Sequence, residues 1–284
     1  MKHVLSVIML VFVLASSSSP ASAAGKNIQI KIDGVVISSD VKPEVRNERT
    51  MVPLRVISEN LGAKVDWSNS GITITKHNTK VQLKLNSNSL TKNGVTSLLD
   101  VKPYVKNERV MVPLRFLSET FGSQVDYKNS TVTVKSEALV INQVKVKSMQ
   151  QEFHMIMGGM VQQNEGNAYN TEMYNIFEEN KGSKVEAPAH YSWMNTIDTL
   201  GSYYKEGQYD FLDAEGKSIQ RYDIYDLIES FPADMLEGYP KILIHDVTED
   251  QWYLFNDAAR QSIYQIMDTA SKNGFFKVIS NTIV

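Results

Sequence analysis

The amino-acid sequence predicts an α+β protein in which a duplicated antiparallel β-sheet/helix module is followed by a separate α+β domain. Three observations favour this fold class. A segment of the first half recurs 60 residues later, each copy alternates strand signals with a short-helix signal, and the net charge changes sign after the second copy. The length of 284 residues allows two domains of ordinary size, and 42% hydrophobic residues is typical of a folded chain.

The repeat is clearest in two segments that begin at residues 41 and 101. Residues 41–55 read VKPEVRNERTMVPLR, and residues 101–115 read VKPYVKNERVMVPLR. Over residues 41–75 and 101–135, 20 of 35 positions are identical. This similarity indicates a tandem duplication. We place the two copies at about 27–76 and 87–136, within a module that spans 27–136.

Each copy is predicted to contain β-hairpins on both sides of a helix. Asp33-Gly34 and Asn93-Gly94 are typical of a type I′ turn, which needs positive φ at both central residues. Apolar residues alternate with polar ones on the flanking segments, as they do in a half-buried strand. The alternating residues include Ile28, Ile30 and Ile32, Ile72 and Ile74, and Val132 and Val134.

The helix of each copy is predicted from its first and last residues. Pro53 and Pro113 fit the first turn of a helix, where a missing N–H costs nothing. Gly62 and Gly122 fit the position just after a helix, where a left-handed conformation is common. Between them, one helical face is apolar in both copies: Leu54, Ile57 and Leu61, and Leu114, Leu117 and Phe121.

The repeated phrase MVPLR-x-(I/L)-S-E-x-(L/F)-G-x-x-V-D-(W/Y), preceded by Asn-Glu-Arg, resembles the copper amine oxidase N-terminal-like (stalk) domain of secreted Gram-positive bacterial proteins. The resemblance covers about residues 27–136. It implies an antiparallel sheet wrapped around a helix, and a module with neither copper nor amine oxidase chemistry. The catalytic part of a true copper amine oxidase would need a His-x-His pair, which this sequence lacks. We therefore expect no amine oxidase activity, no cofactor and no metal.

The first 23 residues have the pattern of a secretory signal peptide. Lys2-His3 precedes an apolar run over 4–15, and Ala21-Ser22-Ala23 provides a small-x-small cleavage site. The apolar run is shorter than the roughly 20 residues of a spanning helix, and we expect no membrane span after cleavage. The chain has no cysteine, which excludes disulfides and thiolate chemistry. The expected location is secreted or extracellular, with wall association as a further expectation.

Charge is divided unequally between the two halves. Residues 24–136 contain 17 Lys and Arg against 10 Asp and Glu, whereas residues 137–284 contain 11 against 22. A net charge of +7 on the first half would attract an anionic cell-wall polymer, and the other candidate partner is a second secreted protein. The two halves could instead attract each other. Nucleic acid is not expected, because no recognition motif occurs.

Six residues of the module are candidate binding residues. In one interpretation the arginines form a basic surface for an anionic polymer and the two aromatic side chains stack on sugars. In the other, the charges are solvated and the aromatic rings pack at the rim of the core. These residues are Arg49, Arg55, Trp67, Arg109, Arg115 and Tyr127.

Residues 140–284 predict an α+β domain of unknown function. We expect helices from Ser148 to about Met160, around 173–177, at 225–230 and at 258–270, with strands near 209–211, 242–244, 252–255 and 275–279. His154 lies among Met155, Met157 and Met160, a composition that suits copper, although methionine is more often a core residue. No nucleophile-elbow, metalloprotease, phosphate-loop or EF-hand motif occurs.

These observations favour a secreted, non-catalytic, envelope-associated binding or structural protein. The repeat module would be a stalk or wall-attachment unit, and the second domain would recognise a ligand or a protein. The alternative is an extracellular hydrolase of cell-wall polymer, with catalysis in the second domain. That alternative requires Asp223, Asp226 and His245 to converge in one cleft.

Overall fold

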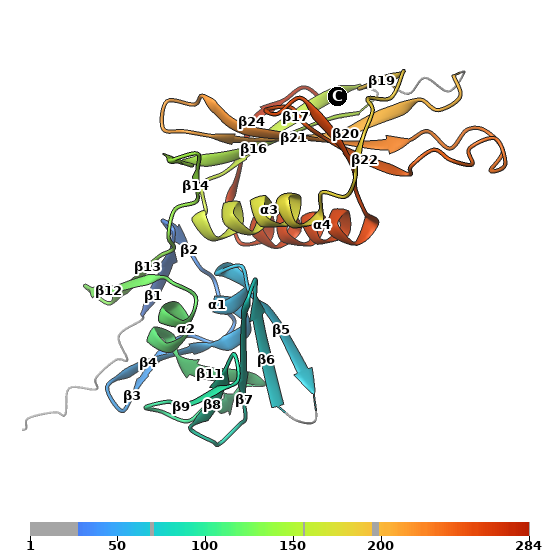
Figure 1. Cartoon of the computed structure of the whole chain (residues 1–284). Helices are drawn as coiled ribbons and strands as arrows, with labels where there is room; N and C mark the ends of the chain where they lie inside the picture. The colour runs from blue at the N-terminus through green and yellow to red at the C-terminus, as the bar shows by residue number, and fades with distance from the viewer. Residues whose placement is uncertain (1–27, 69–70, 156, 195–198, 284) are drawn as a thin grey trace, which may run out of the picture.

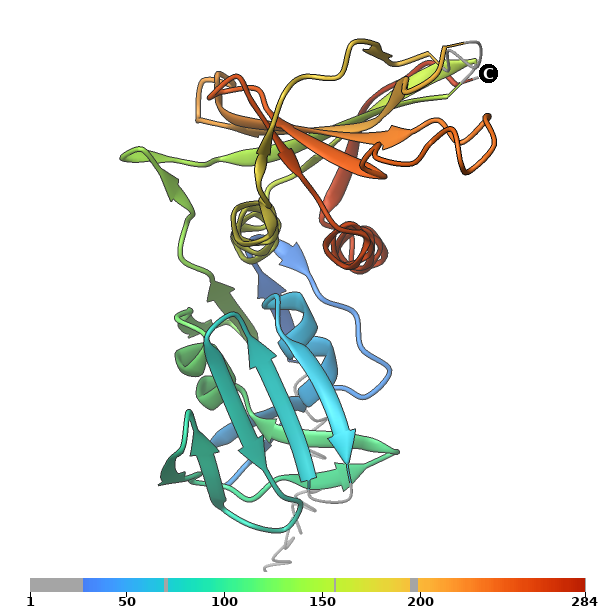
Figure 2. The same ribbon diagram turned by 45° about the vertical axis from the view of Figure 1, so that its right-hand side comes forward.

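The computed structural model describes residues 28–68, 71–155, 157–194 and 199–283. The expected signal peptide lies outside these residues. Figures 1 and 2 show the duplicated module at one end and a large sheet at the other, with two long helices between them. The α+β class and the order of the two parts agree with the prediction.

The two copies of the module have matching elements. The first copy consists of β1 (Gln29–Ile32), β2 (Val35–Val36), β3 (Glu44–Arg46), β4 (Arg49–Pro53), α1 (Leu54–Asn60), β5 (Lys64–Ser68) and β6 (Gly71–Lys76). The strand β7 (Thr79–Leu83) follows it. The second copy consists of β8 (Ser89–Lys92), β9 (Val95–Leu98), β10 (Tyr104–Lys106), β11 (Arg109–Pro113), α2 (Leu114–Thr120), β12 (Gln124–Lys128) and β13 (Thr131–Lys135).

The copies meet at a pseudo-twofold axis between β4 and β11. These strands pair antiparallel, with Val52 opposite Val112, Met51 opposite Pro113 and Met111 opposite Pro53. Equivalent residues of the two copies therefore face each other across one four-stranded sheet of order β10-β11-β4-β3. The two copies therefore share this sheet.

The two short helices begin and end as the sequence indicates, with one difference. Pro53 and Pro113 are N-cap residues in extended conformation, so each helix begins one residue later, at a leucine. Gly62 and Gly122 have φ of +77° and +69°, which confirms the left-handed conformation after each helix. Leu54 and Leu114 are almost completely buried, with 1% and 2% exposure.

The N-terminal hairpin of each copy completes a sheet of the other copy. β8 and β9 belong to the sheet β5-β6-β7-β8-β9, and β1 and β2 belong to the sheet β12-β13-β1-β2. β7 separates β6 from β8, but no strand separates β13 from β1, so these two pair directly and run parallel. Neither copy therefore has a complete sheet of its own.

The C-terminal part is a nine-stranded sheet with two helices on one face (Figure 2). A short hairpin of β14 (Val140–Ile141) and β15 (Val144–Lys145) leads into it. Its strands are β16 (Ser148–Met155), β17 (Gly158–Asn164), β18 (Lys184–Val185), β19 (Tyr191–Ser192), β20 (Tyr203–Leu212), β21 (Ser218–Leu227), β22 (Ile242–Asp246), β23 (Gln251–Leu254) and β24 (Phe276–Asn281). The helices are α3 (Asn167–Asn180) and α4 (Asp257–Lys272).

The sheet has the order β18-β23-β22-β21-β20-β16-β17-β24, with β19 beside β20. All pairings are antiparallel except that of β19 with β20. The face toward α3 and α4 buries an aromatic core that includes Phe177, Tyr209, Phe211 and Tyr222. No helix within the described ranges has the length and apolar character needed to cross a membrane.

Two of the predicted helices are wrong. The segment from Ser148 is the hairpin β16–β17, and the apolar spacing there was misleading because polar side chains occupy its inward face. Gln151 is buried, and it exchanges hydrogen bonds with Tyr209 and with Gln162 of the neighbouring strand. The predicted helix at 225–230 is wrong because β21 continues to Leu227 and residues 228–230 follow it without regular structure; both faces of β21 are buried there, so the alternation of a strand is lost.

The core of the module extends into the C-terminal part. Tyr169 of α3, Ala270 of α4 and Phe275 belong to the same buried cluster as the residues of the repeats. Polar contacts add to this junction, because Asn167 donates to the carbonyl of Ser136 (3.0 Å) and the amide of Ala168 to Asp33 (3.4 Å). The helices α3 and α4 are therefore covered by the sheet on one side and by the module on the other (Figure 1).

Candidate functional site

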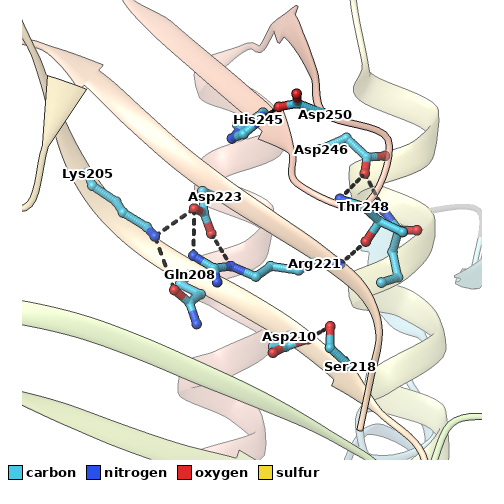
Figure 3. A network of polar contacts seen from close by, with 11 residues as sticks. Lys205, Gln208, Asp210, Ser218, Arg221, Asp223, His245, Asp246, Thr248 and Asp250 are labelled. Atoms are coloured by element: carbon cyan, nitrogen blue, oxygen red, sulfur yellow. Dashed lines mark hydrogen bonds and ion pairs between the residues drawn. The ribbon is translucent and has the colours of Figure 1, made fainter. Parts of the chain in front are cut away.

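The face of the C-terminal sheet that points away from the helices carries a polar network. It lies on β20, β21 and β22, whose side chains alternate between the aromatic core and this outer face (Figure 3). The register brings Gln208 opposite Asp223, and Asp223 opposite His245. The antiparallel pairing therefore gathers polar side chains from three strands on one surface.

The centre of this network is a carboxylate held by two cations. Asp223 accepts a hydrogen bond from the Lys205 ammonium (2.6 Å) and two from the Arg221 guanidinium, both at 3.0 Å (Figure 3). Gln208 accepts a further bond from Lys205 at 3.1 Å. The side chains of Lys205 and Asp223 are only 6% and 3% exposed, and burial lowers the pKa of Lys205 although Asp223 opposes that shift.

Aromatic rings surround the network. The Lys205 ammonium lies 4.5 Å from the centre of the Trp193 ring, which stacks on His154 at 4.3 Å. His245 stacks on Trp252 at 4.5 Å, and the ring of Tyr191 contacts Trp252 edge-on. Tyr191 is 47% exposed. Exposed rings beside buried charges favour stacking and hydrogen bonding with a ligand.

The arrangement suits recognition better than acid–base chemistry. A general base needs a free lone pair within reach of a substrate proton. Asp223 is instead occupied by Lys205 and Arg221, and its side chain is nearly inaccessible. Asp226 lies on the opposite face of the sheet, where it accepts a hydrogen bond from Arg260 of α4 at 2.6 Å. The convergence of Asp223, Asp226 and His245 that a hydrolase would require does not occur.

Asp226 belongs to a second acidic cluster beneath the sheet. Burial, together with the neighbouring charge of Asp226, raises the pKa of Glu206 to about 7. Arg260 contacts both carboxylates and also donates to Asp257. A cavity of about 750 Å³ borders this cluster near Asp226, Asp257 and Arg260. In the described segments no group of three or more His, Cys, Asp or Glu side chains could hold a metal ion.

The methionines near His154 do not surround it. Met155 and Met157 are 58% and 64% exposed at the end of the β16–β17 hairpin. His154 contacts Glu152 at 2.8 Å and the ring of Trp193. The histidine is thus part of the aromatic and polar outer face.

The candidate arginines of the module form ion pairs. Arg49 pairs with Asp100 and Arg109 with Asp40, both at 2.7 Å, so each copy donates an arginine to an aspartate of the other. Arg55 and Arg115 approach the glutamates four residues later on their own helices, at 3.7 and 3.8 Å.

The structure brings only some of the candidate module residues together. Arg49 and Arg115 line one cavity of about 320 Å³, which Lys92 also lines. Trp67 and Tyr127 are 49% and 51% exposed, but they lie on β5 and β12, in different sheets. They do not form one aromatic platform.

The network on the outer face was not predicted from the sequence. Its residues are dispersed over more than 40 positions, from Lys205 to His245, and only strand register brings them together. The alternation of Tyr203, Lys205, Tyr209 and Phe211 was the one available signal, because a lysine within a buried pattern is unusual.

Comparison with known proteins identifies the module. Residues 31–157 match the family described as copper amine oxidase N-terminal domain. The match continues past residue 136, through the hairpin β14–β15 and into β16. No match was found among curated proteins or among solved structures. The family match, the duplicated sequence and the paired hairpin–helix–hairpin units lead to the same conclusion: residues 31–157 are similar to the copper amine oxidase N-terminal domain family.

Proposed function

We propose that the chain is a secreted, non-catalytic, envelope-associated binding or structural protein of a Gram-positive bacterium. The copper amine oxidase N-terminal domain is its stalk or wall-attachment unit. The outer face of the C-terminal sheet is its recognition surface for a ligand or for another secreted protein.

The observation that carries this proposal is the position of the outer face. The helices α3 and α4 and the module occupy one side of the C-terminal sheet (Figure 2). The other side holds the Lys205–Asp223–Arg221 network and the rings of Trp193 and Tyr191. A surface that combines fixed charges with accessible rings, and that points away from the attachment unit, suits recognition.

Attachment to the wall follows from the charge of the module. Its net charge of +7 favours contact with anionic wall polymers such as teichoic acids, through attraction that salt screens. Arg49 and Arg109 are already paired with Asp100 and Asp40, so the other cations of the module provide this attraction. Lys42 and Lys102 are exposed, and they occupy equivalent positions in the two copies.

Co-sedimentation of the whole chain with purified Gram-positive cell walls tests attachment. The whole chain is used because Tyr169, Ala270 and Phe275 complete the core of the module. We expect binding at low salt that is lost near about 1 M salt, where the screening length is about 3 Å. Replacing Lys42 and Lys102 by glutamate should weaken it, whereas the matched changes at Lys217 and Lys241, which are exposed on the C-terminal part, should not. Equal binding by both double variants would refute attachment through the module.

Recognition by the outer face is tested on the same material. Arg221→Ala and Tyr191→Ala alter the outer face without touching the module. We expect these variants to lose any binding that remains after a high-salt wash. If all binding is released by salt and the two variants behave as the original chain does, the outer face is not the recognition surface.

A further inference from the structure

A cleft between the module and α3 contains two opposite charges that lack partners among the residues that the structure describes. Two cavities, of about 310 and 380 Å³, lie on either side of the end of β6. Lys76, His77 and Glu172 line both cavities. Cavities at the junction of two structural units are common places for small-molecule binding.

The charge on the α3 side is Glu172. Its Oε1 atom is buried and has no hydrogen-bond partner among the described residues. Burial raises the pKa of this carboxyl group, and Lys76 opposes the shift only in part. A buried carboxylate oxygen without a donor is costly, because the water it has lost is not replaced.

The charge on the module side is Lys76. Its ammonium makes no hydrogen bond or ion pair within the described part of the chain, and burial lowers its pKa. The opposite charges of Glu172 and Asp33 act on it only through space. Lys76 and Glu172 therefore attract each other across the cleft without meeting.

The walls of the cleft hold these two side chains in place. A Cβ atom at Gly62 would lie 2.8 Å from Cγ of Glu172, so the helix end and α3 are already in close contact there. His77 and Glu179 form an ion pair at 2.7 Å beside the cleft. The rings and side chains of Tyr169 and Ile266 supply an apolar wall.

The lysine and the histidine of the cleft are particular to the first copy. The positions equivalent to Lys76 and His77 in the second copy are Ser136 and Glu137. The amide of Ser136 donates to Asp33 and its carbonyl accepts from Asn167. The second copy thus meets α3 through a direct hydrogen bond from Asn167, whereas the first copy leaves Lys76 and Glu172 facing each other.

We propose that this interdomain cleft binds a compact zwitterion, whose carboxylate pairs with Lys76 and whose ammonium pairs with Glu172. Such a ligand supplies both missing partners at once, and no covalent step is involved. A ligand with one charge would leave the other side chain unpaired. The site is separate from the outer face of the sheet and does not depend on the proposed wall attachment.

Isothermal titration calorimetry of the whole chain at neutral pH tests the proposal. The probes are glycine, β-alanine and 4-aminobutyrate, which separate the same two charges by increasing lengths, and acetate and methylammonium as single-charge controls. We expect saturable binding of at least one zwitterion, and at least tenfold weaker binding of both controls. Absence of saturable binding by all three zwitterions, or equal binding of acetate or methylammonium, would overturn the proposal.

Variants locate the binding in the cleft. Lys76→Met and Glu172→Gln should each weaken it at least tenfold, while Lys80→Met, an exposed lysine on β7, should leave it unchanged. Binding that survives either cleft variant would place the ligand elsewhere. If a variant fails to fold, amide NMR shifts of the original chain during titration test the assignment. The largest shifts should centre on Gly62, His77 and Glu172. Shifts centred elsewhere would contradict the assignment.

Discussion

The two copies of the repeat share a core but not their surroundings. At the pseudo-twofold axis Val52 faces Val112, and each copy sends one arginine to an aspartate of the other. At the far end the copies differ, because β6 is followed by β7 whereas β13 pairs directly with β1. Identical residues therefore specify how the copies meet, and divergent residues specify what each copy contacts outside the repeat.

The C-terminal part contacts the two copies in different ways. α3 lies close to the first copy at Gly62 and faces Lys76 across the cleft, and it contacts the second copy at Ser136. A perfectly symmetric module would offer α3 the same surface twice. The predictions below test how far the symmetry of the core extends, and where it stops.

The largest effect is expected in the shared core. Leu54 and Leu114 are equivalent and almost fully buried, so Leu54→Ala and Leu114→Ala should each lower the free energy of unfolding by about 3 kcal/mol. Urea denaturation of both variants measures this. The two losses should agree within about 1 kcal/mol, because both leucines belong to one buried cluster. If one substitution lowers the free energy of unfolding and the other has a negligible effect, the copies do not share one core.

A smaller effect should distinguish the copies at their helix ends. Gly62 and Gly122 both have positive φ, so alanine at either position costs about 1–2 kcal/mol in backbone strain. A Cβ at Gly62 also meets Glu172 at 2.8 Å, whereas nothing lies within 4 Å of one at Gly122. Gly62→Ala should therefore destabilise the protein more than Gly122→Ala in thermal unfolding.

A second substitution tests whether the contact with Glu172 causes the extra loss of stability in Gly62→Ala. In a Glu172→Ala background the close contact disappears, and the two glycine substitutions should become equal. If Gly62→Ala remains the more damaging change in that background, the contact with α3 does not explain the difference between the copies.

Much of the module could be predicted from the sequence, because its signals are local. Turns such as Asp33-Gly34 and helix ends such as Gly62 depend on the backbone preference of one or two residues. The pairing of β1 with β13 could not be predicted in this way, since the two strands are about 100 residues apart in the sequence and nothing local specifies their register.

The C-terminal sheet was harder to predict from the sequence, for a related physical reason. Gln151 occupies a buried position that a hydrophobic pattern assigns to an apolar residue, and it accepts a hydrogen bond from Gln162 of the neighbouring strand. The Lys205–Asp223 pair of the candidate site likewise places charges where burial is expected. Such residues become interpretable only when their cross-strand partners are known.

The contact of the first copy with Glu172 should also make stability depend on pH. Burial raises the pKa of Glu172 above the usual value of 4.5 for a glutamate, so the folded chain holds this proton to higher pH than the unfolded chain does. Stability should therefore fall as pH rises from about 4.5 through the raised pKa. Glu172→Gln should remove this part of the pH dependence of the melting temperature, and a matched change at the exposed Glu137 should not.

The smallest effect concerns the reciprocal ion pairs that mark the symmetry at the surface. Arg49–Asp100 and Arg109–Asp40 have the same length of 2.7 Å, and all four side chains are more than one-third exposed. Exposed pairs of this kind contribute about 0.2–1 kcal/mol, so double-mutant cycles with alanine should give small and similar coupling energies for both. Salt should reduce both couplings together. A coupling energy several times larger in one pair would mean that the two copies differ in energy at the pseudo-twofold axis as well as at their helix ends.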